Sequence, residues 1–267
     1  MSILQEIAAY KYREVDERKT LFSISSLEKS PLFNRNTLSL MQSLTAEGSS
    51  GVIAEFKRRS PSRGIINAAS RPEEVCQAYI KAGASAVSVL TDEKFFGGSS
   101  EDLMNVRKRI DSPILRKDFI VDEYQIIEAR SIGADAVLLI AELHEADRLA
   151  QLFDFAGSLE LEVLVEVHDE KNISRIPSGT EIVGINSRNL ASFEVDLSHS
   201  SRIIDLLPKD ALKVSESGIS SFDDYWNLKN AGFDAFLVGE YFMKTHDPGK
   251  TCEKFISVLR HQKNTIR

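Results

Sequence analysis

The chain has 267 residues, and its 33 lysines and arginines are outnumbered by 40 aspartates and glutamates, which gives a formal net charge of −7. This acidic balance excludes a broad basic surface for nucleic acid or for an acidic membrane, but it is compatible with one small basic site. Hydrophobic residues make up 42% of the chain, which indicates a globular protein with a large core. Cys76 and Cys252 form no disulfide or zinc motif, which favours a reducing compartment.

Residues 1–48 are expected to form an N-terminal helical extension. Apolar residues at helical spacing from position 3 to position 15 predict one amphipathic helix, and residues 36–44 predict a second. The segment lacks the hydrophobic stretch of a signal peptide, and the chain lacks an apolar run of about 20 residues, so we expect a cytoplasmic protein without membrane contact. Two interpretations of the extension stay open: it covers an apolar surface of the fold, or it helps to close the active-site mouth.

Eight short apolar runs follow the extension and are expected to be strands buried on both faces, because they are rich in β-branched residues and nearly continuous in hydrophobicity. They begin at residues 52, 86, 113, 136, 162, 182, 212 and 235. Helical patterns lie between them, over residues 72–82, 101–110, 123–132, 145–155, 197–207, 221–231 and 249–260.

The phrases KAGASAV, SIGADAV and NAGFDAF repeat the end of a helix, a glycine, a short loop and the start of a strand. In each phrase the glycine (Gly83, Gly133 or Gly232) is placed to end the helix in a left-handed conformation. A βα unit of about 26 residues repeated eight times predicts an α/β fold with a single (β/α)8 TIM barrel in one domain, residues 1–267. A doubly wound open sheet is the alternative.

Active sites of such barrels lie at the carboxyl ends of the strands. The first strand ends with Glu55 and Lys57 on one face, followed by a basic segment containing Arg58, Arg59 and Arg63. This segment suits a phosphate or carboxylate group. The alternatives are a buried or rim salt bridge between Glu55 and Lys57, and a solvated run of charge in the segment that follows.

The third strand ends with Arg116, Lys117 and Asp118, and only one of the two cations can point inward. We expect burial to lower the pKa of an inward Lys117, which would make it a general acid near neutral pH. The alternative is that Lys117 neutralises Asp118 at the rim. Glu166, at the end of the fifth strand, needs a cationic partner, and an inward lysine of the first or third strand would supply it.

The last three strands end in groups suited to anions. Arg188 shares a face with Asn186 after the sixth strand and could hold a planar anion through two hydrogen bonds. Gly218 and Gly239 follow the seventh and eighth strands, where many barrels bind phosphate through backbone N–H groups. Each glycine alone is weak support, because turns need glycine in any case.

These motifs, namely AEFKRRSPSRG, PILRKDFIVDEYQI, LVEVH, VGINSRNL, VSESGI and LVGEYFM, closely resemble the indole-3-glycerol phosphate synthase family of tryptophan biosynthesis. The resemblance covers nearly the whole chain. It implies a carboxy-lyase that closes the indole ring of 1-(2-carboxyphenylamino)-1-deoxyribulose 5-phosphate with loss of carbon dioxide and water. It implies no cofactor and no metal, and we expect a monomer.

The resemblance also assigns residues to the site. Six are implied to be catalytic: Glu55, Lys57, Lys117, Glu166, Asn186 and Ser217. Ten are implied to bind the substrate or its phosphate: Ser60, Phe119, Leu138, Arg188, Leu190, Glu216, Gly218, Leu237, Gly239 and Glu240. Glu240 would bind phosphate through its backbone N–H, so its side chain is expected to point away from the anion.

Two other functions are compatible with a barrel of this kind. A different phosphosugar enzyme, such as phosphoribosylanthranilate isomerase, would need the phosphate loops but not Lys57, Lys117 and Glu166 together. A catalytically silent barrel could act as a binding module, but charged residues at five strand ends are costly to keep without a use.

Overall fold

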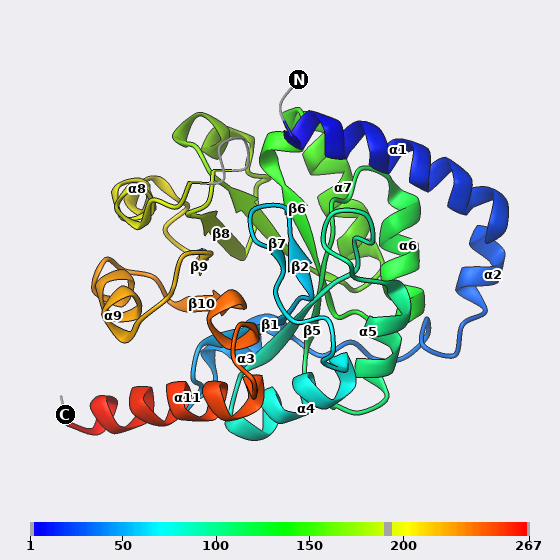
Figure 1. The fold of residues 1–267 in the computed structure, drawn as a ribbon. Coiled ribbons are helices and arrows are strands. Elements are labelled where there is room, and N and C mark those ends of the chain that lie inside the picture. Colours follow the sequence, from blue (N-terminus) through cyan, green and yellow to red (C-terminus); the bar gives the residue numbers. More distant parts are fainter. Residues whose placement is uncertain (1–2, 190–193, 266–267) are drawn as a thin grey trace.

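A computed structural model describes residues 3–189 and 194–265, and it contains a closed barrel of eight parallel strands (Figure 1). The strands follow one another around the barrel in chain order. They are β1 (Val52–Phe56), β4 (Ala86–Leu90), β5 (Ile114–Lys117), β6 (Ala136–Ile140), β7 (Glu162–Val167), β8 (Ile182–Asn186), β9 (Leu212–Glu216) and β10 (Ala235–Val238). The predicted TIM barrel is confirmed, and the open sheet is excluded.

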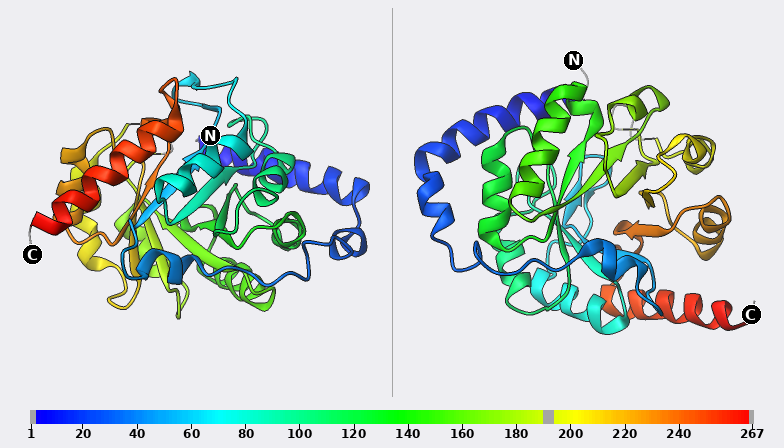
Figure 2. Two further views of the ribbon diagram at one scale, coloured as in Figure 1. Left: turned by 90° about the horizontal axis from the view of Figure 1, so that it is seen from below. Right: turned by 180° about the vertical axis from the view of Figure 1, so that it is seen from behind.

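The predicted helices surround the barrel, with small shifts at their ends (Figure 2). They are α4 (Pro72–Ala82), α5 (Ser100–Arg107), α6 (Glu123–Ile132), α7 (Ala146–Ser158), α8 (Leu197–Ile203), α9 (Phe222–Asn230) and α11 (Pro248–Thr265). Gly83 and Gly133 end α4 and α6 with φ of 100° and 94°, as predicted. Gly232 follows α9 with φ of 106°.

Several short elements were not predicted. A hairpin of β2 (Arg59–Ser60) and β3 (Gly64–Ile65) stands in the first loop after the barrel strand β1, and α10 (Glu240–Met243) follows β10. Three 3-10 helices are η1 (Ala141–Leu143), η2 (Glu170–Arg175) and η3 (Ile204–Leu206). Between β7 and β8 the described chain has η2 in place of an α-helix, so the repeat is irregular in the fifth unit.

The segment before β1 forms α1 (Ile3–Leu21), α2 (Ile24–Glu28) and α3 (Leu40–Thr45). Its first and last helices lie at opposite ends of the barrel. Figure 1 shows α1 running beside α6 on one side and α3 lying near β1 on the other. The Lys11 side chain of α1 contacts Asp118, which follows β5, so α1 lies at the carboxyl ends of the strands. The Met41 N–H of α3 donates to Glu162 at the start of β7. The interpretation that the extension covers an apolar surface is confirmed, because Ile7 and Leu40 pack on the interior cluster of the barrel. No described residue of α1, α2 or α3 lines the cavity at the carboxyl ends of the strands, so a role in closing the active-site mouth stays a prediction.

Alternate residues of each strand point into the barrel, and those at the carboxyl ends of the strands line the cavity described below. Leu115, Leu164 and Leu212 belong to one buried apolar cluster, which Ile7 of α1 and Leu40 of α3 extend at its two ends. Residues on the opposite strand faces pack against the outer helices in a second cluster. Among the described residues, no helix combines the length and the apolar character needed to cross a lipid bilayer.

Candidate active site

One cavity opens at the carboxyl ends of the strands, with an empty volume of about 940 Å³ that is continuous with solvent. Every predicted site residue that the structure describes lines it: Glu55, Lys57, Ser60, Lys117, Phe119, Leu138, Glu166, Asn186, Arg188, Glu216, Ser217, Gly218, Leu237, Gly239 and Glu240. Leu190 lies outside the described residues. The strands thus gather in one place residues that are far apart in the sequence.

Lys117 lies at the centre of the polar part of the cavity. Its Nζ atom is 2.8 Å from Glu166 Oε2 and 2.7 Å from Glu216 Oε2. The Asn186 amide donates to Glu166 Oε1 at 3.1 Å. The predicted pairing of Glu166 with an inward lysine is confirmed, and the alternative in which Lys117 neutralises Asp118 is not observed. The outward Arg116 instead donates to Asp118 and Glu128.

The expectation that Lys117 has a lowered pKa is wrong. Burial alone would lower the pKa of its ammonium group, but the negative charges of Glu166, Glu216 and Glu55 outweigh burial and raise it above the ordinary value. Burial also acts against ionised Glu166, yet Lys117 and the Asn186 hydrogen bond bring the pKa of Glu166 below its usual range. Lys117 therefore holds its proton at neutral pH.

The pKa of the other carboxyl group, that of Glu216, is shifted in the opposite direction. Burial, opposed by Lys117 and reinforced by the Glu166 charge, raises the pKa of Glu216 to about 8. Its Oε1 atom is buried with no hydrogen-bond partner among the described residues. The pKa values of the two carboxyl groups that share Lys117 are thus shifted in opposite directions, which is the pattern of a site that keeps an acid and a base side by side.

The raised pKa of Glu216 predicts a pH dependence of stability that Glu216→Gln should remove. The folded state keeps this proton up to about pH 8, whereas the unfolded chain releases it near the ordinary value of 4.5. The stabilisation is therefore complete below pH 4.5 and is lost as pH rises through 8. Relative to the variant, the wild-type free energy of unfolding should fall across this window by up to about 1.4 kcal/mol per pH unit. Urea unfolding of both proteins at several pH values measures this difference in the free energy of unfolding. If the free energies of the two proteins change with pH in parallel, the raised pKa of Glu216 is contradicted.

A second ion pair joins Glu55 and Lys57 at 2.8 Å, with both side chains largely buried at the end of β1. A Cβ atom on Gly239 would lie 3.0 Å from the Glu55 Cβ atom and 2.5 Å from its Oε1 atom. Glycine at position 239 therefore leaves room for the Glu55 carboxylate inside the mouth. Glu55 and Lys57 lie on one face as predicted, and the salt bridge that was the alternative interpretation is also present. Both residues line the cavity.

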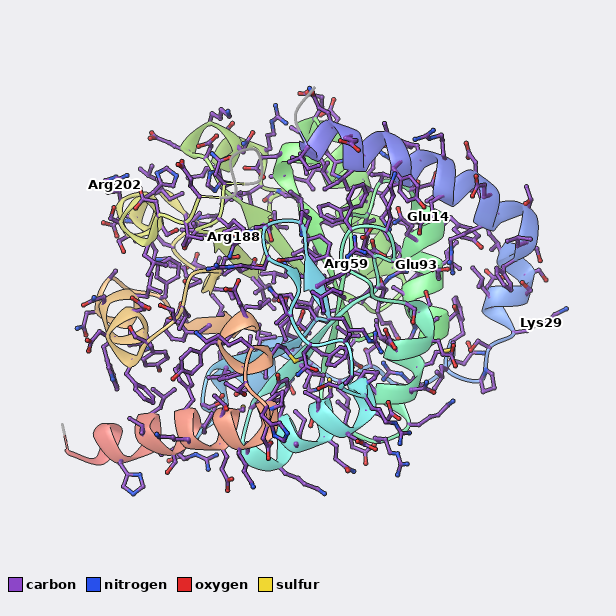
Figure 3. All side chains as sticks on the ribbon, in the orientation of Figure 1. Glu14, Lys29, Arg59, Glu93, Arg188 and Arg202 are labelled. Atoms are coloured by element: carbon purple, nitrogen blue, oxygen red, sulfur yellow. The ribbon has the colours of Figure 1, made fainter. Side chains whose placement is uncertain are left out.

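The basic segment after β1 is only partly directed at the cavity. Arg58 pairs with Asp102 of α5, and Arg59 donates to the Lys94 carbonyl, so both turn away from the mouth. Figure 3 labels Arg59, which belongs to β2, and Arg188, which contacts the Ser62 hydroxyl in the turn of the same hairpin. The expectation that all the arginines of this segment gather around the anion is therefore wrong for Arg58 and Arg59.

The Glu240 side chain lines the cavity and forms ion pairs with two arginines. It pairs with Arg188 at 3.3 Å and with Arg63 at 3.1 Å. Arg188 also donates to the Ser62 hydroxyl at 3.2 Å. The two arginines hold the Glu240 carboxylate beside the cavity, and the expectation that it points away from a bound anion stays a prediction. Its carboxylate contacts cationic groups that suit an anionic substrate.

The chain turns sharply after β9, where Ser217 has φ of 65° and Gly218 has φ of 87°. A left-handed conformation costs a residue other than glycine about 1–2 kcal/mol, and such strain gathers at functional sites. This turn and the Gly239 turn follow the neighbouring strands β9 and β10, and both line the cavity. The seventh and eighth barrel strands thus end where barrels commonly bind phosphate.

The apolar part of the cavity contains Phe119, Leu138 and Leu237, as predicted, and also Phe96, which was not predicted. The rings of Phe96 and Phe119 lie 5.9 Å apart. Phe96 comes from the loop after β4, where the only signal was two phenylalanines before two glycines. Seven further lining residues were also missed: Pro61, Ser62, Leu90, Asp118, Ile140, Ile219 and Val238.

The polar groups of this cavity suit acid–base chemistry on an anionic aromatic molecule. Lysine and glutamate carboxyl groups can exchange protons, and the phenylalanine rings offer a surface for stacking. Within the described part of the chain, no group of three or more histidine, cysteine, aspartate or glutamate residues is placed to hold a metal ion.

Comparisons with known proteins agree with this geometry. The family model described as indole-3-glycerol phosphate synthase matches residues 4–255. A protein of that name from Bacteroides thetaiotaomicron is 48% identical over 258 residues, which cover 97% of this chain and 99% of the relative. Proteins of the same name from Aliarcobacter butzleri and Campylobacter jejuni are 41% and 40% identical, over 96% and 95% of this chain and 99% and 100% of the relatives.

Proposed function

The chain belongs to the indole-3-glycerol phosphate synthase family, and from this premise we propose how its cavity residues share the reaction. The protein is a carboxy-lyase of tryptophan biosynthesis that converts 1-(2-carboxyphenylamino)-1-deoxyribulose 5-phosphate to indole-3-glycerol phosphate, carbon dioxide and water. The family match decides against an isomerase and against a silent binding barrel. The observation that carries the site assignment is the meeting of Lys117, Glu166 and Glu216 in one cavity.

In the first step, Lys117 is the general acid. The aniline ring attacks the ribulose carbonyl carbon, the carbonyl oxygen takes the proton of Lys117, and positive charge develops on the amine nitrogen. The Glu166 carboxylate stabilises that charge or acts as a base. Loss of carbon dioxide then restores the aromatic ring. With a raised pKa, Lys117 begins the step protonated, as an acid must, but it gives up its proton less readily than a lysine with the lowered pKa that the sequence led us to expect. The role therefore depends on the position of Lys117 in the cavity and not on its pKa.

In the second step, the hydroxyl group leaves as water and the ring carbon next to nitrogen loses a proton. We assign Lys57 to the substrate carboxylate and to proton transfer during this dehydration. Glu55 and Asn186 form the second group that handles protons. The 2.8 Å ion pair between Glu55 and Lys57 supports the assignment, because a proton can pass between the two side chains.

The remaining residues hold the two ends of the substrate. Arg188, Glu216 and Ser217 orient it. Phosphate binds at one end, to the Ser60 hydroxyl and to the backbone of Gly218, Gly239 and Glu240. The aromatic ring binds at the other end, against apolar side chains. These are Phe96, Phe119, Leu138, Leu190 and Leu237.

The function is tested by giving the purified protein the carboxyphenylamino substrate alone, with a chelator present. We expect the fluorescence of indole to develop, because the proposed roles use only side chains of this chain. Inorganic phosphate should slow the reaction competitively, since it occupies the phosphate end. If a folded sample produces no indole fluorescence, the proposed function is wrong.

The proposal also includes the domain bounds, the oligomeric state and the cellular compartment. Residues 1–267 form one domain with 1–48 as its extension, which the shared apolar cluster of Ile7, Leu40 and the barrel interior supports. A monomer is sufficient, because one chain supplies both the polar and the apolar parts of the described cavity. Cytoplasmic residence fits Cys76 and Cys252, which are both free and buried.

A further inference from the structure

A buried lysine of the N-terminal helix connects two loops of the cavity. Lys11 is fully buried, and its Nζ atom lies 2.9 Å from Asp92 after β4 and 2.9 Å from Asp118 after β5. Glu14, one turn further along α1, lies 3.1 Å away. Glu14 and Glu93 mark this region on the α1 side of the molecule (Figure 3). The reaction as described above makes no use of Lys11.

Each aspartate bound to Lys11 also holds the backbone of a phenylalanine in the cavity. Asp92 Oδ1 accepts hydrogen bonds from the N–H groups of Phe95 and Phe96, at 2.7 and 3.0 Å. Asp118 Oδ1 accepts one from the Phe119 N–H at 2.8 Å. Phe96 and Phe119 both line the cavity, with ring centres 5.9 Å apart.

The charge of Lys11 is required for this arrangement. Asp92 and Asp118 are buried, and two buried carboxylates repel each other unless a cation lies between them. Burial acts against the Lys11 ammonium group, but Asp118, Asp92 and Glu14 together raise its pKa above the ordinary value, so it stays charged. Removal of the cation would push the two loops apart at the point where they carry Phe96 and Phe119.

We propose that Lys11 is a positioning residue for the aromatic end of the substrate: it holds the loops after β4 and β5 at the separation that lets Phe96 and Phe119 enclose the ring. The inference rests on the proposed assignment of that end of the cavity. It gives α1 a defined part in recognition, although no atom of Lys11 lines the cavity.

The test compares Lys11→Met with the wild-type chain in steady-state kinetics. We expect KM for the substrate to rise about tenfold while kcat falls less than about threefold. The inhibition constant of inorganic phosphate should stay unchanged, because phosphate binds at the opposite end. Equal effects on KM and on phosphate inhibition would overturn the proposal, since they would indicate a general disturbance of the barrel.

A second variant tests whether charge repulsion displaces the two loops. Lys11→Met leaves Asp92 without a cation, whereas Asp118 keeps its ion pair with Arg116. Lys11→Met/Asp92→Asn removes the uncompensated charge, while the asparagine oxygen still accepts from the Phe95 and Phe96 N–H groups. The double variant should therefore regain thermal stability and most of the wild-type KM. If it regains stability but keeps the full increase in KM, repulsion between the carboxylates does not set the separation of the loops, and the proposal is excluded.

Two controls assign the cause. Arg18→Met removes another contact of α1, the one between Arg18 Nε and Glu128 at 2.7 Å, and should leave KM unchanged. Phe96→Leu should raise KM by itself. If Phe96→Leu has no effect, the assignment of the aromatic end fails. If Phe96→Leu raises KM and Lys11→Met does not, only the role of Lys11 fails.

Discussion

Lys117→Ala is expected to lower kcat by about a thousandfold or more and to change KM much less. The Lys117 ammonium group is the proposed source of the proton that the carbonyl oxygen takes as the carbon–carbon bond forms, and a group that acts in the transition state affects kcat more than binding. Its loss also leaves Glu166 and Glu216 facing each other without the cation that now lies between them.

The rate of indole formation and the melting temperature should be measured on the same samples. Lys117→Met keeps most of the side-chain volume without the charge, so it should lose as much activity as the alanine variant. Lys213→Ala is the matched control, because Lys213 occupies β9 but lies outside the cavity lining. A kcat within about tenfold of wild type, or about 1.4 kcal/mol of barrier, would assign the acid to another residue.

The barrel could be predicted because its strands are buried on both faces and therefore appear as short apolar runs. The helix ends at Gly83 and Gly133 could also be predicted, because a residue with left-handed φ at the end of a helix is usually glycine. The hairpin after β1 and the short helix α10 have too few residues for a periodic pattern. Their form depends on contacts with other loops, which a local reading of the sequence does not contain.

The polar part of the site was predicted because charged residues interrupt apolar strands there. The direction of the Lys117 pKa was not, because it depends on Glu166 and Glu216 both lying within 3 Å, at 2.8 and 2.7 Å. Lys11 left one signal that was overlooked: it stands between Ile7 and Val15 on the buried face of α1. A lysine in the middle of a buried stripe requires buried carboxylates, although the sequence does not say which.

Gly184→Ala, a change of one methyl group, is expected to lower both kcat and stability. Gly184 lies in β8 beside Glu166 of β7, and a Cβ atom there would lie 3.0 Å from the Glu216 carboxyl carbon, closer still to Oε1, and 3.3 Å from Leu164. The Glu216 carboxyl group must therefore move away from Lys117. A shift of about 1 Å in such a group can cost about a hundredfold in rate, and overpacking a buried site costs about 1–3 kcal/mol of stability.

The same substitution at Gly157 is the matched control, because a Cβ atom there meets nothing within 4 Å and the residue lies in helix α7. Gly157→Ala should raise the free energy of unfolding by about 0.4–1 kcal/mol without affecting kcat. A double-mutant cycle then identifies the cause: in a Glu216→Ala background the added methyl group no longer meets a carboxylate, so Gly184→Ala should cost much less stability than it does in the wild-type chain. If the cost is the same in both backgrounds, Leu164 or the strand itself limits the space at position 184, and the glycine does not serve Glu216.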